Sequence, residues 1–246
     1  MLSPVVELRR YQLRPGGRDV LIDLFDRALV ESQEREGMAV IGQFREVDDP
    51  HVFTWLRGFP NMIERARSLD RFYSGPVWQA HRVAANATML DVANVLLLRP
   101  ARPDSAFALD GERAAPGSHA APPGIVEATV LHLERSVDER EILSFFELAI
   151  ADVVESDGGR VLGYFLTKES ENTFPSLPVR ENLSVFCFFC GYPVEDDAGR
   201  EHSSGATRTV EEAPGLRGAP EVIRLQPTPR SLLTAQSPAC PARRST

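Results

Sequence analysis

The sequence has few cysteines and no long hydrophobic run, and these absences exclude several classes of protein. Three cysteines in 246 residues are too few for the disulfide frameworks of small secreted domains. No apolar stretch approaches the roughly 18 residues that a membrane-spanning helix needs. The first residues run directly into a strand pattern, without the layout of a signal peptide. These features predict a cytoplasmic protein with no membrane partner.

Excess positive charge and the common catalytic motifs are absent as well. The formal net charge is −8, whereas nucleic-acid binding depends mainly on basic residues that neutralise phosphates. We therefore expect no nucleic-acid partner. The sequence lacks HxH, HxxxH and HxxE patterns, a glycine-rich phosphate loop and a Gly-x-Ser-x-Gly elbow. We expect neither a metal nor another cofactor.

One cysteine pair, Cys187 and Cys190, forms a CxxC that invites a redox or zinc interpretation. The pair lies inside VFCFFCGY, which has the composition of a buried strand. Side chains three positions apart on a strand point to opposite faces, and no second CxxC is present. We expect both thiols to be structural.

An internal repeat is the strongest positive signal in the sequence. VFTWLRGFP at 52–60 recurs as VFCFFCGYP at 185–193. Three further pairs match in the same order: VELRRYQL at 6–13 with VEATVLHL at 126–133, VIGQF at 40–44 with VLGYF at 161–165, and LLLRP at 96–100 with IRLQP at 223–227. Because self-similarity in a constant order indicates a duplicated unit, we predict two tandem units of about a hundred residues.

The apolar periodicity within the first unit predicts a β-α-β-β-α-β order, the ferredoxin-like motif. The predicted strands are 5–13, 38–47, 51–59 and 92–99, and the predicted helices are 19–36, 61–73 and 76–85. The second unit repeats this order, with a weak helix within 194–219. We expect a first unit over 1–101, a proline-rich linker over 102–124 that packs on the surface around Phe107, a second unit over 125–229 and a disordered tail over 230–246.

A ferredoxin-like unit leaves one sheet face uncovered. We therefore predict an α+β fold in which the two units close sheet against sheet into a barrel-like pseudo-dimer. Whether this pseudo-dimer pairs again as a homodimer is left open.

The first unit resembles the NIPSNAP domain of the dimeric α/β-barrel superfamily. The resemblance covers 5–101 and is weaker over 125–233. It is carried by VELRRYQLRPGG, GMAVIGQF, FTWLRGF and FYSGPVWQAHRVAANATMLD. It implies a ferredoxin-like fold whose barrel interior can hold a small molecule. Relatives in the superfamily include cofactor-independent oxygenases and cyclases, but the NIPSNAP domain has no agreed chemistry, and a fold alone does not determine a function.

Two strands of the first unit carry candidate ligand-binding residues. Arg9 and Tyr11 share a strand face with Glu7. They form either a polar patch that lines the barrel, with Arg9 binding an anionic or carbonyl group, or an ion pair that fixes the first strand or the interface between the repeats. Trp55 and Arg57 share a face of the third strand. They can clamp a planar or anionic ligand, or Trp55 can be core with Arg57 as its neighbour.

The segment 72–91 holds the remaining candidates. Tyr73, Trp78 and Asn86 are expected to bind the ligand, with the Asn86 amide stabilising a carbonyl or an oxyanion. His81 is the candidate catalytic residue, because histidine exchanges protons near neutral pH. The alternative is a hydrogen-bonded structural histidine. The second unit has lost most of these polar groups, so any site is expected in the first.

Three hypotheses follow. The leading one is a protein that binds a small organic ligand, an aromatic or carbonyl compound, in the barrel cavity. The second is a cofactor-independent oxygenase, cyclase or isomerase in which His81 is the acid or base. The third is a protein-interaction module without a pocket, which a completely filled barrel interior would favour.

Overall fold

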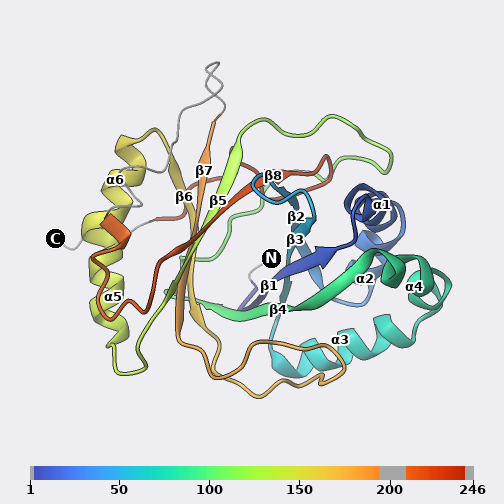
Figure 1. The fold of residues 1–246 in the computed structure, drawn as a ribbon, viewed down its shortest axis with the longest axis horizontal. Coiled ribbons are helices and arrows are strands. Elements are labelled where there is room, and N and C mark those ends of the chain that lie inside the picture. The colour runs from blue at the N-terminus through green and yellow to red at the C-terminus, as the bar shows by residue number, and fades with distance from the viewer. Residues whose placement is uncertain (1–2, 194–208, 242–246) are drawn as a thin grey trace.

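The computed structural model describes residues 3–193 and 209–241, and the eight strands within these residues form one closed barrel (Figure 1). Around the barrel the strand order is β1-β3-β2-β8-β5-β7-β6-β4. The strands are β1 (Val5–Leu13), β2 (Ala39–Glu46), β3 (Val52–Phe59), β4 (Met89–Pro100), β5 (Ile125–His132), β6 (Arg160–Thr167), β7 (Val185–Tyr192) and β8 (Glu221–Pro227).

The barrel consists of two four-stranded halves with the same strand order. The first half runs β4-β1-β3-β2 and the second runs β8-β5-β7-β6, which is the ferredoxin-like order in each case. Short antiparallel pairings join the halves, β2 with β8 at Phe44–Glu46 and β4 with β6 at Leu98–Pro100. The predicted mixed fold of helices and a strand-rich barrel is confirmed.

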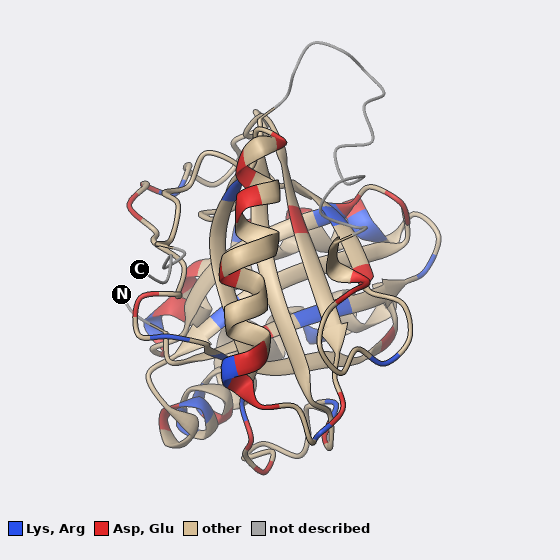
Figure 2. Cartoon of the chain, turned by 90° about the vertical axis from the view of Figure 1, so that its left-hand side faces the viewer, with Lys and Arg blue, Asp and Glu red and all other residues tan. Residues whose placement is uncertain are grey.

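Helices cover the outside of the barrel on two opposite sides (Figure 1). The first half has α1 (Gly17–Leu24), the π-helical turn η1 (Phe25–Leu29), α2 (Val30–Arg35), α3 (Met62–Ser74) and α4 (Pro76–Thr88). The second half has α5 (Glu139–Phe145), the π-helical turn η2 (Phe146–Ile150) and α6 (Ala151–Ser156), which stand at the front of Figure 2. The helix predicted over 19–36 is therefore interrupted by a π turn, a feature frequent at functional sites. None of the described helices is both long and apolar enough to span a membrane.

The interior of the barrel is a packed apolar core rather than a cavity. Both halves contribute to it: Val6, Leu8, Leu56 and Leu98 come from the first, and Val126, Ala128, Phe165, Phe189 and Leu225 from the second. An eight-stranded barrel is wide enough either for its own side chains or for one small ligand, and here buried apolar side chains from both halves occupy the interior. The expectation of a ligand cavity between the two sheets is wrong for the part of the chain that the structure describes.

The predicted linker contributes to this core. Phe107 is buried, with its ring centroid 4.7 Å from that of Phe165 and 5.0 Å from that of Phe189. The expectation that residues around Phe107 pack on the surface is therefore wrong, because the barrel core accepts the ring.

The two cysteines of the CxxC lie on opposite faces of β7, as predicted. Cys187 packs in the barrel core and Cys190 packs against the helices of the second half. Burial raises the pKa of both thiols above its ordinary value, so both are protonated and inert at neutral pH.

The prediction of a disordered tail is wrong for residues 230–241. Leu233, Ala235 and Cys240 are buried. The amide of Leu233 donates to the Ile41 carbonyl at 2.9 Å, and the amide of Cys240 donates to the Val161 carbonyl at 2.8 Å. Both carbonyls lie at register shifts of β2 and β6, where a bulge leaves backbone groups without a strand partner. The tail supplies the missing donors, a role that its composition did not reveal.

Two other expectations fall wholly or largely beyond the described residues. The weak helix predicted within 194–219 lies mostly over 194–208, and the last tail residues, 242–246, are likewise outside.

Leu233 provides a test of the tail's contribution to stability. We expect Leu233→Ala to lower the free energy of unfolding by about 2–5 kcal/mol, the cost of truncating a buried leucine, as measured by urea denaturation. Leu232→Ala is the matched control, because its half-buried side chain should cost clearly less. Equal effects of the two substitutions would show that the tail does not pack as described.

Candidate functional site

An aromatic cleft of about 90 Å³ lies between the sheet and the helices of the first half. This aromatic cleft is lined by Tyr11, Leu21, Phe25, Leu29, Gln33, Trp55, Phe72, Tyr73, Trp78, Asn86, Met89, Val92 and Leu177. The structure thus brings together five of the eight site residues predicted from the sequence: Tyr11, Trp55, Tyr73, Trp78 and Asn86.

The local sequence explains why these side chains converge. On β1 and β3, Tyr11 and Trp55 take the outward positions because Leu8 and Leu56 occupy inward ones. The side chain of Asn61 caps α3 by accepting a hydrogen bond from the Glu64 amide at 2.9 Å, which satisfies a free helix donor. Gly75 then ends α3 in an extended conformation and Pro76 begins α4, the position where proline is favoured.

This break between α3 and α4 folds the chain back so that aromatic rings meet edge to face. The ring centroids of Tyr73 and Trp78 are 4.9 Å apart with an interplanar angle of 81°. Those of Phe25 and Trp55 are also 4.9 Å apart, at 66°. Such pairs favour particular ring orientations, and the walls of the cleft are mainly apolar.

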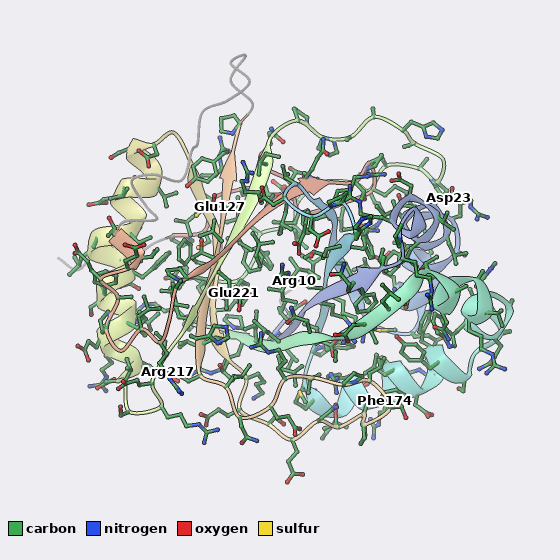
Figure 3. All side chains as sticks on the ribbon, in the orientation of Figure 1. Arg10, Asp23, Glu127, Phe174, Arg217 and Glu221 are labelled. Atoms are coloured by element: carbon green, nitrogen blue, oxygen red, sulfur yellow. The ribbon has the colours of Figure 1, made fainter. Side chains whose placement is uncertain are left out.

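A segment of the second half covers one side of the cleft. The connection between β6 and β7, residues 168–184, runs along the lower edge of the view beneath α3 (Figure 1), and Figure 3 shows Phe174 beside that helix. The Phe174 ring stacks on that of Tyr73 with centroids 5.8 Å apart, and Leu177 lines the cleft. Neither residue was predicted from the sequence, because this segment matches nothing in the repeat.

Four charged residues form a buried group directly behind the cleft wall, and we call Glu7, Arg9, Arg57 and Arg65 the arginine cluster. One Glu7 oxygen, Oε2, accepts hydrogen bonds from Arg9 Nη1 at 2.8 Å and Arg57 Nε at 2.7 Å. The other, Oε1, accepts one from Arg65 Nε at 2.6 Å. All four side chains are 0% exposed. Burial opposes ionisation of Glu7, but the three guanidiniums outweigh it and hold the pKa of Glu7 below its ordinary value.

The arginine cluster contacts the cleft wall at several points. Arg9 Nε donates to the Tyr11 hydroxyl at 2.8 Å, and Arg57 Nη1 donates to Gln33 Oε1 at 3.2 Å. The Arg57 guanidinium lies 4.9 Å from the centre of the Trp55 ring, within the range of a cation–π interaction. Arg9 and Arg57 are therefore one side chain away from the cleft.

The position of the cluster corrects one sequence expectation. Of the two interpretations of Arg9 and Tyr11, lining of the barrel is wrong, whereas an ion pair on the first strand is present, because Arg9 Nη1 contacts Glu7 Oε2 at 2.8 Å. The shared strand face is real, but it points toward the helices, because Val6 and Leu8 take the inward positions. Arg65 was not predicted, although it precedes Leu69 and Phe72 by four and seven residues on the buried face of α3, and an arginine in such a stripe is a readable signal.

His81 is not among the residues that line the cleft. It is half-buried on α4, three residues beyond Trp78, which does line the cleft. Its catalytic role remains a prediction.

In the second half, aromatic side chains pack between the sheet and the helices. The Phe146 ring lies 5.1 Å from those of both Phe186 and Phe188. Glu127 is the counterpart of Glu7. In the first half β3 places Arg57 opposite Glu7, whereas in the second half β7 places Cys190 opposite Glu127. The predicted loss of polar groups from this half is confirmed by the register.

Outside the aromatic cleft, the described residues contain a wider hollow and no metal-binding cluster. A wider hollow of about 580 Å³ runs along segment 168–184, lined by charged residues such as Lys168, Arg180 and Glu181 and by no aromatic side chain. No group of three or more His, Cys, Asp or Glu side chains in residues 3–193 and 209–241 is placed to hold a metal ion.

Comparison with solved structures shows the same fold at low sequence identity. A monooxygenase-like protein from Fusobacterium nucleatum subsp. nucleatum has a TM-score of 0.51 and 11% identity, over 92% of this chain and 93% of that one. One from Lactobacillus acidophilus NCFM has a TM-score of 0.51 and 12% identity, over 92% and 94%. An anthrone oxidase-like protein has a TM-score of 0.51 and 11% identity, over 95% and 98%. These likenesses establish the fold and not the activity.

Comparison at the level of sequence family is more specific for the first half. No curated protein sequence matches the chain. Residues 6–102, which contain the four strands of the first half and most of the cleft wall, match the family model NIPSNAP. The resemblance predicted from the sequence is thereby confirmed: over residues 6–102 this chain carries the NIPSNAP pattern.

Proposed function

We propose that this protein binds a small, planar organic molecule in the aromatic cleft of its first half. The observation that carries the proposal is the convergence of Tyr11, Trp55, Tyr73 and Trp78 from separate elements on one concave apolar site. Apolar clefts with a few polar groups are typical of small-ligand sites. The filled barrel interior would favour an interaction module, but the cleft on its helix side supports a ligand-binding protein instead.

The size of the cleft limits the ligand. At about 90 Å³ it is smaller than the roughly 300–1,000 Å³ of sites for drug-sized molecules. A compound with a single ring is therefore favoured. A larger ligand would have to displace Phe174 and Leu177, which segment 168–184 lays against the cleft.

The tryptophans provide a direct test. The chain has two, Trp55 and Trp78, and both line the cleft. We expect one-ring phenols, quinones, β-dicarbonyls or aromatic carboxylates to change the tryptophan fluorescence saturably. The bound compound should also raise the thermal midpoint by mass action. The screen consists of a thermal-shift assay followed by fluorescence titration.

A pair of variants on α4 checks where the ligand binds. Trp78→Ala removes a wall of the cleft and should weaken binding by about tenfold or more, the effect of losing a well-packed aromatic contact. Val83→Ala is the control on the same helix, because Val83 is 76% exposed and does not line the cleft. Equal binding by both variants, or no compound that binds, would contradict the proposed function.

The enzymatic alternative rests on His81 as acid or base, with Arg9 or Arg57 stabilising negative charge. The buried guanidiniums of Arg9 and Arg57, behind Tyr11 and Trp55, are compatible with stabilisation of negative charge. No contact of His81 within the described residues favours a role as acid or base. We therefore propose binding rather than catalysis. Once a ligand is known, a test for its turnover by His81→Ala addresses the alternative.

A further inference from the structure

The arginine cluster has unbalanced charge. Three guanidiniums against the single carboxylate of Glu7 leave a formal net charge of +2 on side chains that are all 0% exposed. Buried charges in proteins are normally paired. Glu7 already accepts one hydrogen bond from each of the three arginines through its two oxygens.

The cluster also has unused hydrogen-bond donors. In the part of the chain that the structure describes, Nη2 of Arg9, Nη2 of Arg57 and Nη2 of Arg65 are buried without a hydrogen-bond partner. So is Nε1 of Trp55, which belongs to the cleft wall. Buried donors without partners are rare in native proteins and call for an explanation. Of these donors, only Trp55 Nε1 belongs to a residue that lines the cleft, and the three guanidiniums lie behind the cleft wall.

Tyr11 connects this excess charge to the cleft. Its hydroxyl oxygen accepts a hydrogen bond from Arg9 Nε, so its own proton is available for donation. Among the residues described, the Tyr11 hydroxyl donates to none. A hydroxyl that accepts from a guanidinium is polarised and becomes a stronger donor to a negatively charged oxygen.

We infer that the ligand of the cleft is a planar carboxylate, whose anionic oxygen is bound by the Tyr11 hydroxyl with Arg9 behind it. The ring of the ligand then lies among Trp55, Tyr73 and Trp78, and the carboxylate faces the cleft floor, where it offsets the positive charge of the arginine cluster. This inference rests on the proposed function, because it names the chemical class that the same cleft selects.

The test compares benzoate with benzamide, which share ring and shape and differ in charge. Tryptophan fluorescence titrations of the unaltered protein at neutral pH should show benzoate binding at least about tenfold more tightly, the advantage of a charge-assisted hydrogen bond. Equal affinities, or tighter binding of benzamide, would overturn the carboxylate inference and leave the proposed function intact. Tighter binding of phenyl phosphate than of benzoate would also overturn it. If neither benzoate nor benzamide binds but another one-ring compound does, the carboxylate inference alone is refuted. If no compound binds, both the carboxylate inference and the proposed function are refuted.

A conservative variant separates recognition of the anion from the shape of the cleft. Tyr11→Phe removes only the hydroxyl and should weaken benzoate binding by about tenfold while changing benzamide binding by less than about twofold. Tyr164→Phe is the matched control, because this buried tyrosine of the second half donates to Glu147 at 3.4 Å far from the cleft lining. An equal loss of both ligands in Tyr11→Phe would assign Tyr11 a shaping role and overturn the inference. Should Tyr11→Phe not fold, the ligand pair on the unaltered protein decides.

Discussion

Replacing Glu7 with glutamine should destabilise the protein by roughly 3–5 kcal/mol, the cost of removing one partner from a buried ion pair. The substitution preserves the shape of the side chain but leaves Arg9, Arg57 and Arg65 without their shared carboxylate. The loss is measured as the change in the free energy of unfolding in urea at pH 7.

The pH dependence of stability provides an independent check on Glu7. Because the pKa of Glu7 is lowered from its model-compound value of 4.5, the folded state binds fewer protons than the unfolded state in acid. The stabilisation is therefore fully present above about pH 4.5 and is lost progressively as the pH falls below it. We expect this acid loss in the unaltered protein and a flatter profile in Glu7→Gln. Similar stability of the two proteins at pH 7 would contradict the buried ion network.

Replacing Glu127, the counterpart of Glu7 in the second half, should have the opposite effect. Burial raises the pKa of Glu127 to about 7, and Arg224 on the neighbouring strand offsets this only in part. Across the strand pair lies Cys190, which carries no charge as a buried thiol. The Glu127 carboxylate is thus buried without the guanidiniums that surround Glu7.

The sign of the Glu127 effect follows from its raised pKa. Between pH 4.5 and 7 the folded state binds more protons than the unfolded state, so this group lowers stability as the pH rises through that window. At pH 8, Glu127→Gln should therefore raise the free energy of unfolding by up to roughly 3 kcal/mol. At pH 4 the change should be small. A loss of stability at pH 8 would show that the Glu127 carboxylate has a strong partner in the folded protein.

The repeat made most of the fold predictable. The paired segments predicted strands at 6–13 and 52–60 in the first unit and at equivalent positions in the second, and the observed ladders join the two segments within each half. The helices predicted over 61–73 and 76–85 correspond to α3 and α4. The π turn at Phe25–Leu29 was not predictable, because its residues keep the same apolar stripe as the helix around it.

The candidate site was predictable in composition but not in location. Alternation along β1 correctly grouped Glu7, Arg9 and Tyr11 on one face. It did not indicate which face, because both faces of this sheet are buried, one by the barrel core and one by helices. A period of two separates inside from outside only where one face meets water.

Some contributions that were not predicted come from distant parts of the chain. Asn172 and Thr173 each accept a hydrogen bond from Arg65 Nη1 at 3.1 Å, and Phe174 stacks on Tyr73. Contacts between residues about a hundred positions apart depend on how the two halves close. Local pattern and composition contain no information on that closure.

The most direct test of the account is a crystal structure of the protein with bound benzoate. We expect the ring in the aromatic cleft among Trp55, Tyr73 and Trp78, with the carboxylate within hydrogen-bonding distance of the Tyr11 hydroxyl. Benzoate inside the barrel, or in the charged hollow beside residues 168–184 with the cleft empty, would contradict it.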